Sequence, residues 1–302
     1  MDEISGENVH KLQDVLEKLE YFRNISKAGI ESLSDQQYID LQSEINDYFS
    51  AWGYWIGNFN QDQKFYRVTV NKRITGRNEQ YLDKISQLTG PPKRFLKTIG
   101  RCNSLEVPIF YASNSLKAAI MEAVPEEGDV LTMTIWKLKP DQKMNCCQIF
   151  HPDVTPYDPT YPTIYDHFIK GESTGDVLLD RVRTENIKFL TEEFVKTVEG
   201  KDPRNYIFSS LFSEKIFVGN TKREANHIDS VWYPSTKIRN GQKNLAMADS
   251  MVHQKLDLLE IAFTMVTRIW ETPEVPYRKI DFEIEKITTT KDFEIAADKF
   301  AP

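Results

Sequence analysis

The N-terminal sixty residues show the apolar spacing of two helices. In the first stretch, apolar side chains recur every three or four residues, at Val9, Leu12, Leu16, Leu19 and Phe22. Ser34, with Gln37 three residues later, has the pattern of a capping box that begins a second helix. The stripe of that helix follows at Tyr38, Leu41, Ile45, Tyr48, Phe49 and Trp52. We therefore expect a helical hairpin over residues 5–58 that ends in an aromatic cluster at 52–55. We interpret this hairpin as a surface that docks against the rest of the chain. The alternative is that it forms a separate functional module.

Beyond residue 60 the pattern changes to short strands mixed with helices. Alternation and short apolar runs predict strands at 64–70, 107–111, 130–138, 227–234, 255–268 and 277–289. Helices are expected from a cap at Ser115 and over 175–197 and 203–213, with loops around 90–92 and 151–163 and a turn at 239–241. This order predicts an α+β chain with two domains, a helical N-terminal extension over 1–60 and a body over 61–302.

Composition and charge exclude several classes of protein. The chain has 302 residues, of which 40% are apolar, so it can bury a sizeable core without disulfides. No apolar run approaches the roughly 20 residues of a membrane helix, and no secretory signal is visible at the N-terminus. The net charge of −7 argues against a nucleic-acid partner.

The three cysteines do not form a recognisable metal or disulfide pattern. Cys146 and Cys147 are neighbours, Cys102 is distant, and none has metal-ligand spacing with the five histidines. We expect reduced thiols, a cytoplasmic location and no bound metal. Core packing is the favoured interpretation of the cysteine pair.

Four polar residues stand out because they occur in apolar surroundings. Arg67 lies within a strand-like run, Arg101 follows a glycine, Glu122 lies within an apolar helical stretch and Ser235 follows Tyr-Pro. A partly buried arginine needs an anionic partner. Taken singly, each residue fits a structural ion pair or a turn. Taken together, two arginines can hold a pyrophosphate, and a lone carboxylate can stabilise positive charge on a sugar ring.

The same residues lie in motifs that resemble the RES domain family, named for its Arg, Glu and Ser. The family's opening Y-R is similar to Tyr66-Arg67, and its G-R-F-N to Gly100-Arg101-Cys102-Asn103. Its Tyr-x-Ala strand and the helix that follows it are similar to the segments Tyr111-Ala112-Ser113 and Ala118-Ala119-Ile120-Met121-Glu122. Its Y-P-S and G-x-N-L motifs are similar to Tyr233-Pro234-Ser235 and Gly241-Gln242-Lys243-Asn244-Leu245. The resemblance spans about residues 64–250 and departs from the family at Cys102, Glu106, Lys117 and Met121.

The resemblance implies an ADP-ribosyltransferase-like body that uses NAD as a substrate, with no further cofactor. It implies that Glu122 stabilises an oxocarbenium-like ribose during loss of nicotinamide. Arg67 and Arg101 would hold the pyrophosphate, and Ser235 the ribose or a phosphate. Tyr111, with Tyr66 beside it, would contact the nicotinamide-ribose end, and Asn244 would support the serine loop.

Several functions remain open on this basis. The acceptor is phosphate or water, which makes the chain an NAD phosphorylase or glycohydrolase acting as a toxin or defence effector. A partner of antitoxin type would cover the cleft, and the oligomeric state is left open. The alternatives are an ADP-ribosyltransferase that modifies a macromolecule, a non-catalytic NAD sensor, and an interaction protein that works through the N-terminal hairpin.

Overall fold

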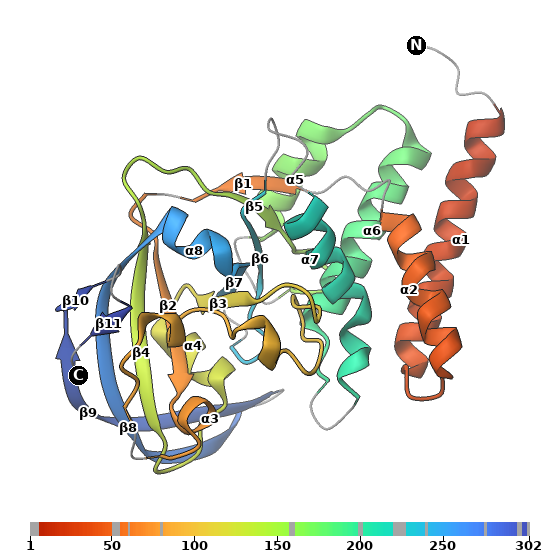
Figure 1. The fold of residues 1–302 in the computed structure, drawn as a ribbon. Helices are drawn as coiled ribbons and strands as arrows, with labels where there is room; N and C mark the ends of the chain where they lie inside the picture. Colours follow the sequence, from red (N-terminus) through yellow and green to blue (C-terminus); the bar gives the residue numbers. More distant parts are fainter. Residues whose placement is uncertain are drawn as a thin grey trace. The chain divides into compact units, whose positions relative to one another are not determined.

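The computed structural model describes residues 6–49, 55–59, 61–78, 81–156, 161–198, 202–219, 228–238, 241–274, 277–294 and 298–300. Helices and strands alternate along the chain, which confirms the predicted mixture of α and β (Figure 1). The likeness to ADP-ribosyltransferases stays a prediction. No helix in these ranges combines the length and apolar character that crossing a membrane requires.

The chain forms two compact units. The first comprises Met1–Gly57, Leu96–Val107 and Cys146–Pro234, and the second comprises Asn58–Phe95, Pro108–Asn145 and Ser235–Pro302. The first passage between them lies close to the boundary expected at residue 60. The chain then returns twice to the unit that contains the N-terminal helices.

An antiparallel sheet is the centre of the second unit. Its strand order is β7-β3-β2-β4-β8-β9. The strands are β2 (Lys64–Val70), β3 (Ile109–Ser113), β4 (Val130–Leu138), β7 (Lys243–Ala248), β8 (Leu256–Glu274) and β9 (Tyr277–Thr290). The smaller elements are α3 (Lys72–Thr75), η1 (Ile85–Gln87), η2 (Lys93–Phe95), α8 (Asp249–Lys255), β10 (Phe293–Glu294) and β11 (Lys299–Phe300).

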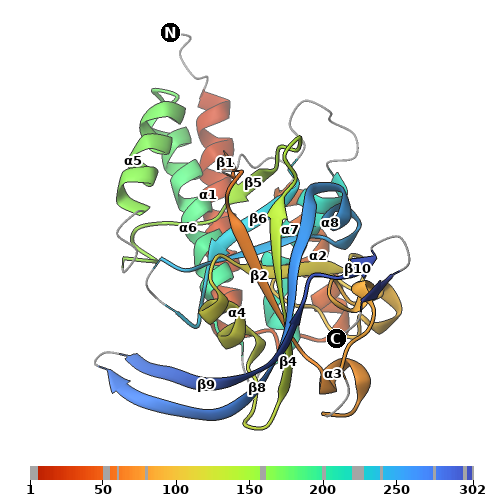
Figure 2. The ribbon, with the colours of Figure 1, turned by 90° about the vertical axis from the view of Figure 1, so that its left-hand side faces the viewer.

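The strand expected at 255–268 is confirmed, but β8 continues six residues further, to Glu274. Beyond Met265, the last partner of β4, β8 pairs with β9 alone, and Figure 2 shows the two continuing as a ribbon. In the sequence, Pro273 suggests that the strand ends before it, because proline has no N–H to donate to a neighbouring strand. A two-stranded ribbon has free edges, where that loss is tolerated.

Helix α4 (Leu116–Ala123) covers one face of this sheet. Its start confirms the predicted cap, since the Ser115 hydroxyl accepts a hydrogen bond from the Ala118 N–H at 3.1 Å. Ile120 packs in a cluster with Val70, Leu131, Met133 and Val266. The helix ends at Val124, whose φ of 45° is left-handed and stops further helical bonding. These features fix the last turn of α4, which carries Glu122.

Helices dominate the first unit. They are α1 (Gly6–Ala28), α2 (Asp35–Phe49), α5 (Tyr161–Glu172), α6 (Val177–Val195) and α7 (Ile207–Gly219), with the short helix η3 (Pro203–Tyr206) before α7. Its strands are β1 (Trp55–Asn58), β5 (Asn145–Gln148) and β6 (Ser230–Pro234), and β5 pairs with β6 in parallel.

The N-terminal hairpin docks onto α6 and α7, as its apolar stripes predict. Phe22 is fully buried, and its ring lies 5.4 Å from that of Phe208 on α7. The predicted capping box is present, because the Ser34 N–H donates to Gln37 Oε1 at 2.9 Å. Trp55 stacks on Phe168 at 4.9 Å. The other members of the expected aromatic cluster, residues 52–54, lie outside the described residues.

Two expectations for the middle of the chain are corrected. The loop predicted over 151–163 ends early, because α5 begins at Tyr161. Its second residue is Pro162, and proline is tolerated in a first helical turn, where its missing N–H would have no partner. The strand β5 was not predicted. It carries Cys146 and Cys147, which are fully buried and unbridged, as core packing requires. Of the turn expected at 239–241, residues 239 and 240 lie outside the described residues.

Candidate active site

Glu122 is the centre of a polar cluster in the second unit. Three hydrogen bonds reach the same carboxylate oxygen, Oε1. They come from Ser235 Oγ at 2.7 Å, Asn244 Nδ2 at 2.8 Å and the Thr236 N–H at 3.3 Å. No described residue donates to the other oxygen, Oε2. The side chain is half-buried. The carboxylate is therefore held in one orientation with one oxygen left for a ligand.

Ser235 organises the loop that follows β6. Its side chain is completely buried. Besides donating to Glu122, its hydroxyl accepts hydrogen bonds from the N–H groups of Lys237 and Ile238, both at 3.2 Å. Its own N–H donates to the Gln242 carbonyl at 2.8 Å. All of these contacts are within the protein, and they hold the Ser235 hydroxyl against Glu122. The role of Ser235 as a ligand of ribose or phosphate stays a prediction.

Asn244 is oriented by a residue that the sequence analysis did not assign. Asn244 on β7 is the register partner of Ser113 on β3. The buried Ser113 hydroxyl donates to Asn244 Oδ1 at 2.5 Å. Because the oxygen of the amide is engaged there, its nitrogen points at Glu122. Ser113 is the last residue of the segment Tyr111-Ala112-Ser113 that carries part of the family resemblance. Its register against Asn244 depends on a pairing between strands about 130 residues apart, which no local pattern reveals.

The two tyrosines lie on the same face of the sheet as this cluster. Tyr66 is the register partner of Ser113, and Tyr111 precedes Ser113 by two positions. Tyr66 and Asn114, with Asp62, Gln63 and Lys64, line a hollow of about 360 Å³. The structure thus brings together Glu122, Ser235 and Asn244 and places the tyrosines on the same side.

Arg67 is directed away from this cluster. Successive strand residues face opposite sides, so Arg67 lies on the other face of β2 from Tyr66. Its guanidinium stands 5.3 Å from the Phe110 ring, and Nη1 donates to the Tyr111 carbonyl at 3.0 Å. β2 and β3 pair only at Tyr66 and Ser113. Arg67 therefore donates to β3 where the strand-to-strand ladder is absent.

Arg67 makes no direct ion pair with a carboxylate among the described residues. Its Nε is buried and has no hydrogen-bond partner within that part of the chain. Burial lowers the pKa of Arg67 to about 10, and the nearby Asp249 carboxylate opposes this shift. Asp249 itself accepts a hydrogen bond from the Gly90 N–H at 2.5 Å. The guanidinium remains charged at neutral pH, held by a carbonyl and an aromatic face instead of an ion pair.

Arg101 belongs to the first unit, where it binds the end of α6. Its guanidinium donates to the carbonyls of Phe194 and Lys196, the latter at 3.1 Å, and to the Tyr206 hydroxyl at 3.4 Å. The rings of Tyr206 and Tyr233 lie 5.1 and 6.0 Å from it. Arg101 thus satisfies carbonyls that a helix leaves without partners at its C-terminus. Its role as a pyrophosphate ligand stays a prediction.

The thiol of Cys102 is not suited to act as a nucleophile. Burial raises the pKa of Cys102 to about 12, so its thiol is protonated at neutral pH and is a poor nucleophile. Within the described ranges, no group of three or more His, Cys, Asp or Glu side chains is arranged to hold a metal ion.

Comparisons with protein-family models, with curated proteins and with solved structures each find no match. The family resemblance therefore depends on the motifs alone, and the functional argument depends on the geometry around Glu122.

Proposed function

We propose that the chain is an NAD-degrading enzyme that cleaves the bond between nicotinamide and ribose, with Glu122 as the catalytic carboxylate. The arrangement that supports this most directly is the fixation of Glu122 Oε1 by Ser235, Asn244 and the Thr236 N–H, with Oε2 left open. Such a group is suited to stabilise positive charge that develops on a bound ring, because it needs no reorganisation during the reaction.

The chemistry of NAD fits a site with a carboxylate and no strong acid. Its nicotinamide is a cationic leaving group that takes the electron pair of the broken C–N bond and departs neutral. The positive charge passes to the ribose, where Glu122 Oε2 would stabilise it and accept a hydrogen bond from a ribose hydroxyl. Water as the acceptor then gives ADP-ribose and a proton, and phosphate gives ADP-ribose-1″-phosphate. The two tyrosines supply aromatic surface on the same face of the sheet.

The proposal gives the other predicted residues supporting roles. Ser235 and Asn244 position Glu122. Arg67 and Arg101 are engaged with backbone carbonyls, so they hold the strands and a helix end in place. The proposed chemistry does not require these two arginines to bind the pyrophosphate.

The experiment that tests the proposal is an incubation of the purified protein with NAD, with and without inorganic phosphate, followed by mass analysis. ADP-ribose in both buffers indicates a hydrolase, and ADP-ribose-1″-phosphate only with phosphate indicates a phosphorylase. A control with added protein acceptor and radiolabelled NAD detects transfer to a macromolecule. Intact NAD in every arm, with a correctly folded protein, contradicts the proposal.

Replacing Ser113 by alanine should lower kcat for NAD cleavage by about 10-fold, with KM changed less than about two-fold. The substitution frees the Asn244 amide to turn away from Glu122, and a misoriented catalytic carboxylate affects the transition state more than binding. Steady-state kinetics measure the effect. Ser250→Ala, at an exposed position on α8, is the matched control. An unchanged kcat would show that Asn244 does not need Ser113 for its orientation.

A further inference from the structure

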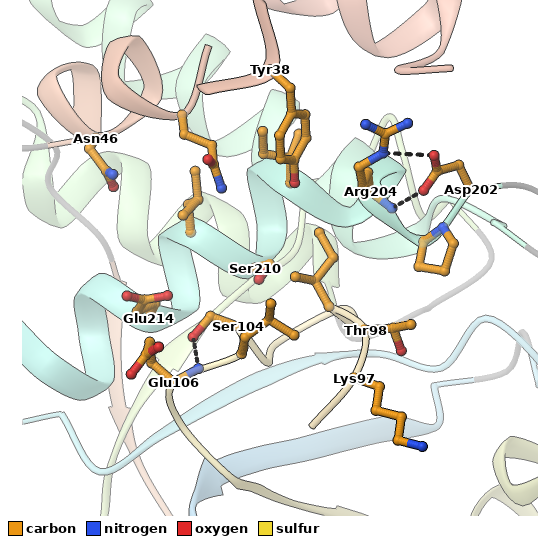
Figure 3. Close-up of a pocket in the computed structure, with 16 residues that line it drawn as sticks. Tyr38, Asn46, Lys97, Thr98, Ser104, Glu106, Asp202, Arg204, Ser210 and Glu214 are labelled. Atoms are coloured by element: carbon orange, nitrogen blue, oxygen red, sulfur yellow. Dashed lines mark hydrogen bonds and ion pairs between the residues drawn. The ribbon is translucent and has the colours of Figure 1, made fainter. Parts of the chain in front are cut away.

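A second cavity lies wholly within the first unit, on the N-terminal hairpin. It has a volume of about 490 Å³, and its walls come from α2, the loop 97–106, η3 and α7 (Figure 3). We call it the α2–α7 groove. Pockets of this size are typical of specific binding sites. It contains none of the residues around Glu122, so its role is independent of the proposed NAD chemistry.

One wall of the groove is a line of polar side chains on α2. Tyr38, Gln42 and Asn46 all line it. They are spaced four residues apart, so they lie along one face of the helix at steps of about 6 Å. Their hydroxyl and amide groups have no hydrogen-bond partner among the described residues. Three unused polar groups therefore face the same cavity.

The floor of the groove is apolar. Ile207 and Leu211 on α7 are buried beneath it, and Ile99 and Leu105 line it from the loop. Leu105 is 46% exposed, so its side chain is accessible to a segment that lies in the groove. The groove thus combines a polar wall with an apolar floor.

The groove has a direction and two ends. The guanidinium of Arg204, just before α7, lies 5.3 Å from the Tyr38 ring, while Lys215 Nζ donates to the Asn46 carbonyl at 3.0 Å. Helices α2 and α7 therefore run side by side in the same direction, from the Arg204 end to the Glu214 end. Figure 3 shows Lys97 and Glu214 well apart at the margins of the groove. Neither charge is paired within the described part of the chain.

We propose that the α2–α7 groove binds an extended segment of a partner protein. The step of about 6 Å along α2 is close to the two-residue repeat of an extended chain, about 6.6 Å. A Gln or Asn amide both donates and accepts, so Gln42 and Asn46 match the N–H and C=O groups of a peptide backbone. The span from Tyr38 to Asn46, about 12 Å, corresponds to about four extended residues.

The apolar floor and the charged margins define the chemistry of that segment. Alternate apolar side chains of the segment would enter the floor over Ile207 and Leu211. A basic residue would lie toward Glu214 and an acidic one toward Lys97. The partner is thus recognised by a short extended stretch with opposite charges at its ends.

The test uses the full-length protein and four capped, fluorescein-labelled hexapeptides with two leucines separated by serines. Two carry lysine at one end and aspartate at the other, in both orders. The third carries lysine at both ends, and the fourth carries aspartate at both ends. Fluorescence anisotropy should show at least one of the oppositely charged peptides binding about three-fold to ten-fold tighter than either like-charged peptide.

Two variants separate the groove from nonspecific attraction. Gln42→Ala should weaken the binding of the best peptide by about five-fold to ten-fold. Gln36→Ala, on the exposed side of α2, should leave that affinity unchanged. Glu214→Lys should make the peptide with aspartate at both ends the best ligand. Equal binding of all four peptides, an unaffected Gln42→Ala variant, or no binding up to about 1 mM would each overturn the proposal.

Discussion

Replacing Glu122 by glutamine should lower the rate of NAD cleavage by about 100-fold or more while the protein remains folded. Glutamine has nearly the same shape, and its oxygen can still accept the hydrogen bonds of Ser235, Asn244 and the Thr236 N–H. The variant therefore removes the negative charge beside the ribose without dismantling the loop. Because that charge acts mainly in the transition state, kcat should fall and the affinity for NAD should change little.

The control for this variant is Glu285→Gln, which neutralises an exposed carboxylate on β9 and should leave both activity and melting temperature unchanged. In cells, expression of the unaltered chain should deplete NAD and arrest growth, and expression of the Glu122→Gln variant should not. A purified Glu122→Gln protein with full NAD turnover would show that another group carries the chemistry. If its melting temperature fell sharply, the loss of activity would be assigned to folding.

The local elements around the site could be predicted because their signals are short in range. The Ser115 cap, the apolar positions of α4 and the strand patterns of 64–70 and 130–138 all depend on neighbouring residues. The structure confirms the cap, the helix and the two strands β2 and β4. The motif order also placed Glu122, Ser235 and Asn244 in one site, and hydrogen bonds join them in the structure.

The positions of Tyr66 and Arg67 in one strand bear on the role of Arg67. Tyr66 and Arg67 are consecutive residues of a strand, so they face opposite sides of its sheet and cannot easily serve one pocket. The family motif placed both in the same site and hid this conflict. The alternation does not predict that β2 and β3 pair only at Tyr66 and Ser113. This limited pairing leaves the Tyr111 carbonyl to accept a hydrogen bond from Arg67.

Other features depend on pairings that are distant in sequence. The register of Ser113 against Asn244 and the two-stranded end of β8 are set by which strands meet, and local composition does not encode that choice. The same holds for Arg101. A glycine-arginine pair in a loop is compatible with a ligand site or with a helix end, and only the tertiary structure brings α6 to it.

Replacing Arg101 by methionine should destabilise the protein by about 2–4 kcal/mol and lower its melting temperature by about 5–10 °C. Methionine can still fill the space between Tyr206 and Tyr233, so the loss comes from the carbonyls of Phe194 and Lys196, which lose a charged donor. Loss of the cation–π contacts adds a smaller amount. Thermal and urea unfolding measure the effect, and Arg77→Met, an exposed arginine, is the matched control.

The same variant separates the two roles considered for Arg101. If the guanidinium only supports the end of α6, folded Arg101→Met protein should bind NAD with an affinity within about two-fold of that of the unaltered protein. The measurement is made well below the melting temperature of the variant. A pyrophosphate ligand would behave differently, because losing one charge-assisted pair weakens binding by about 10-fold or more with little change in stability. A normal melting temperature with a large rise in KM for NAD would therefore return Arg101 to the substrate site. It would also require its bonds to Phe194 and Lys196 to open when the nucleotide binds.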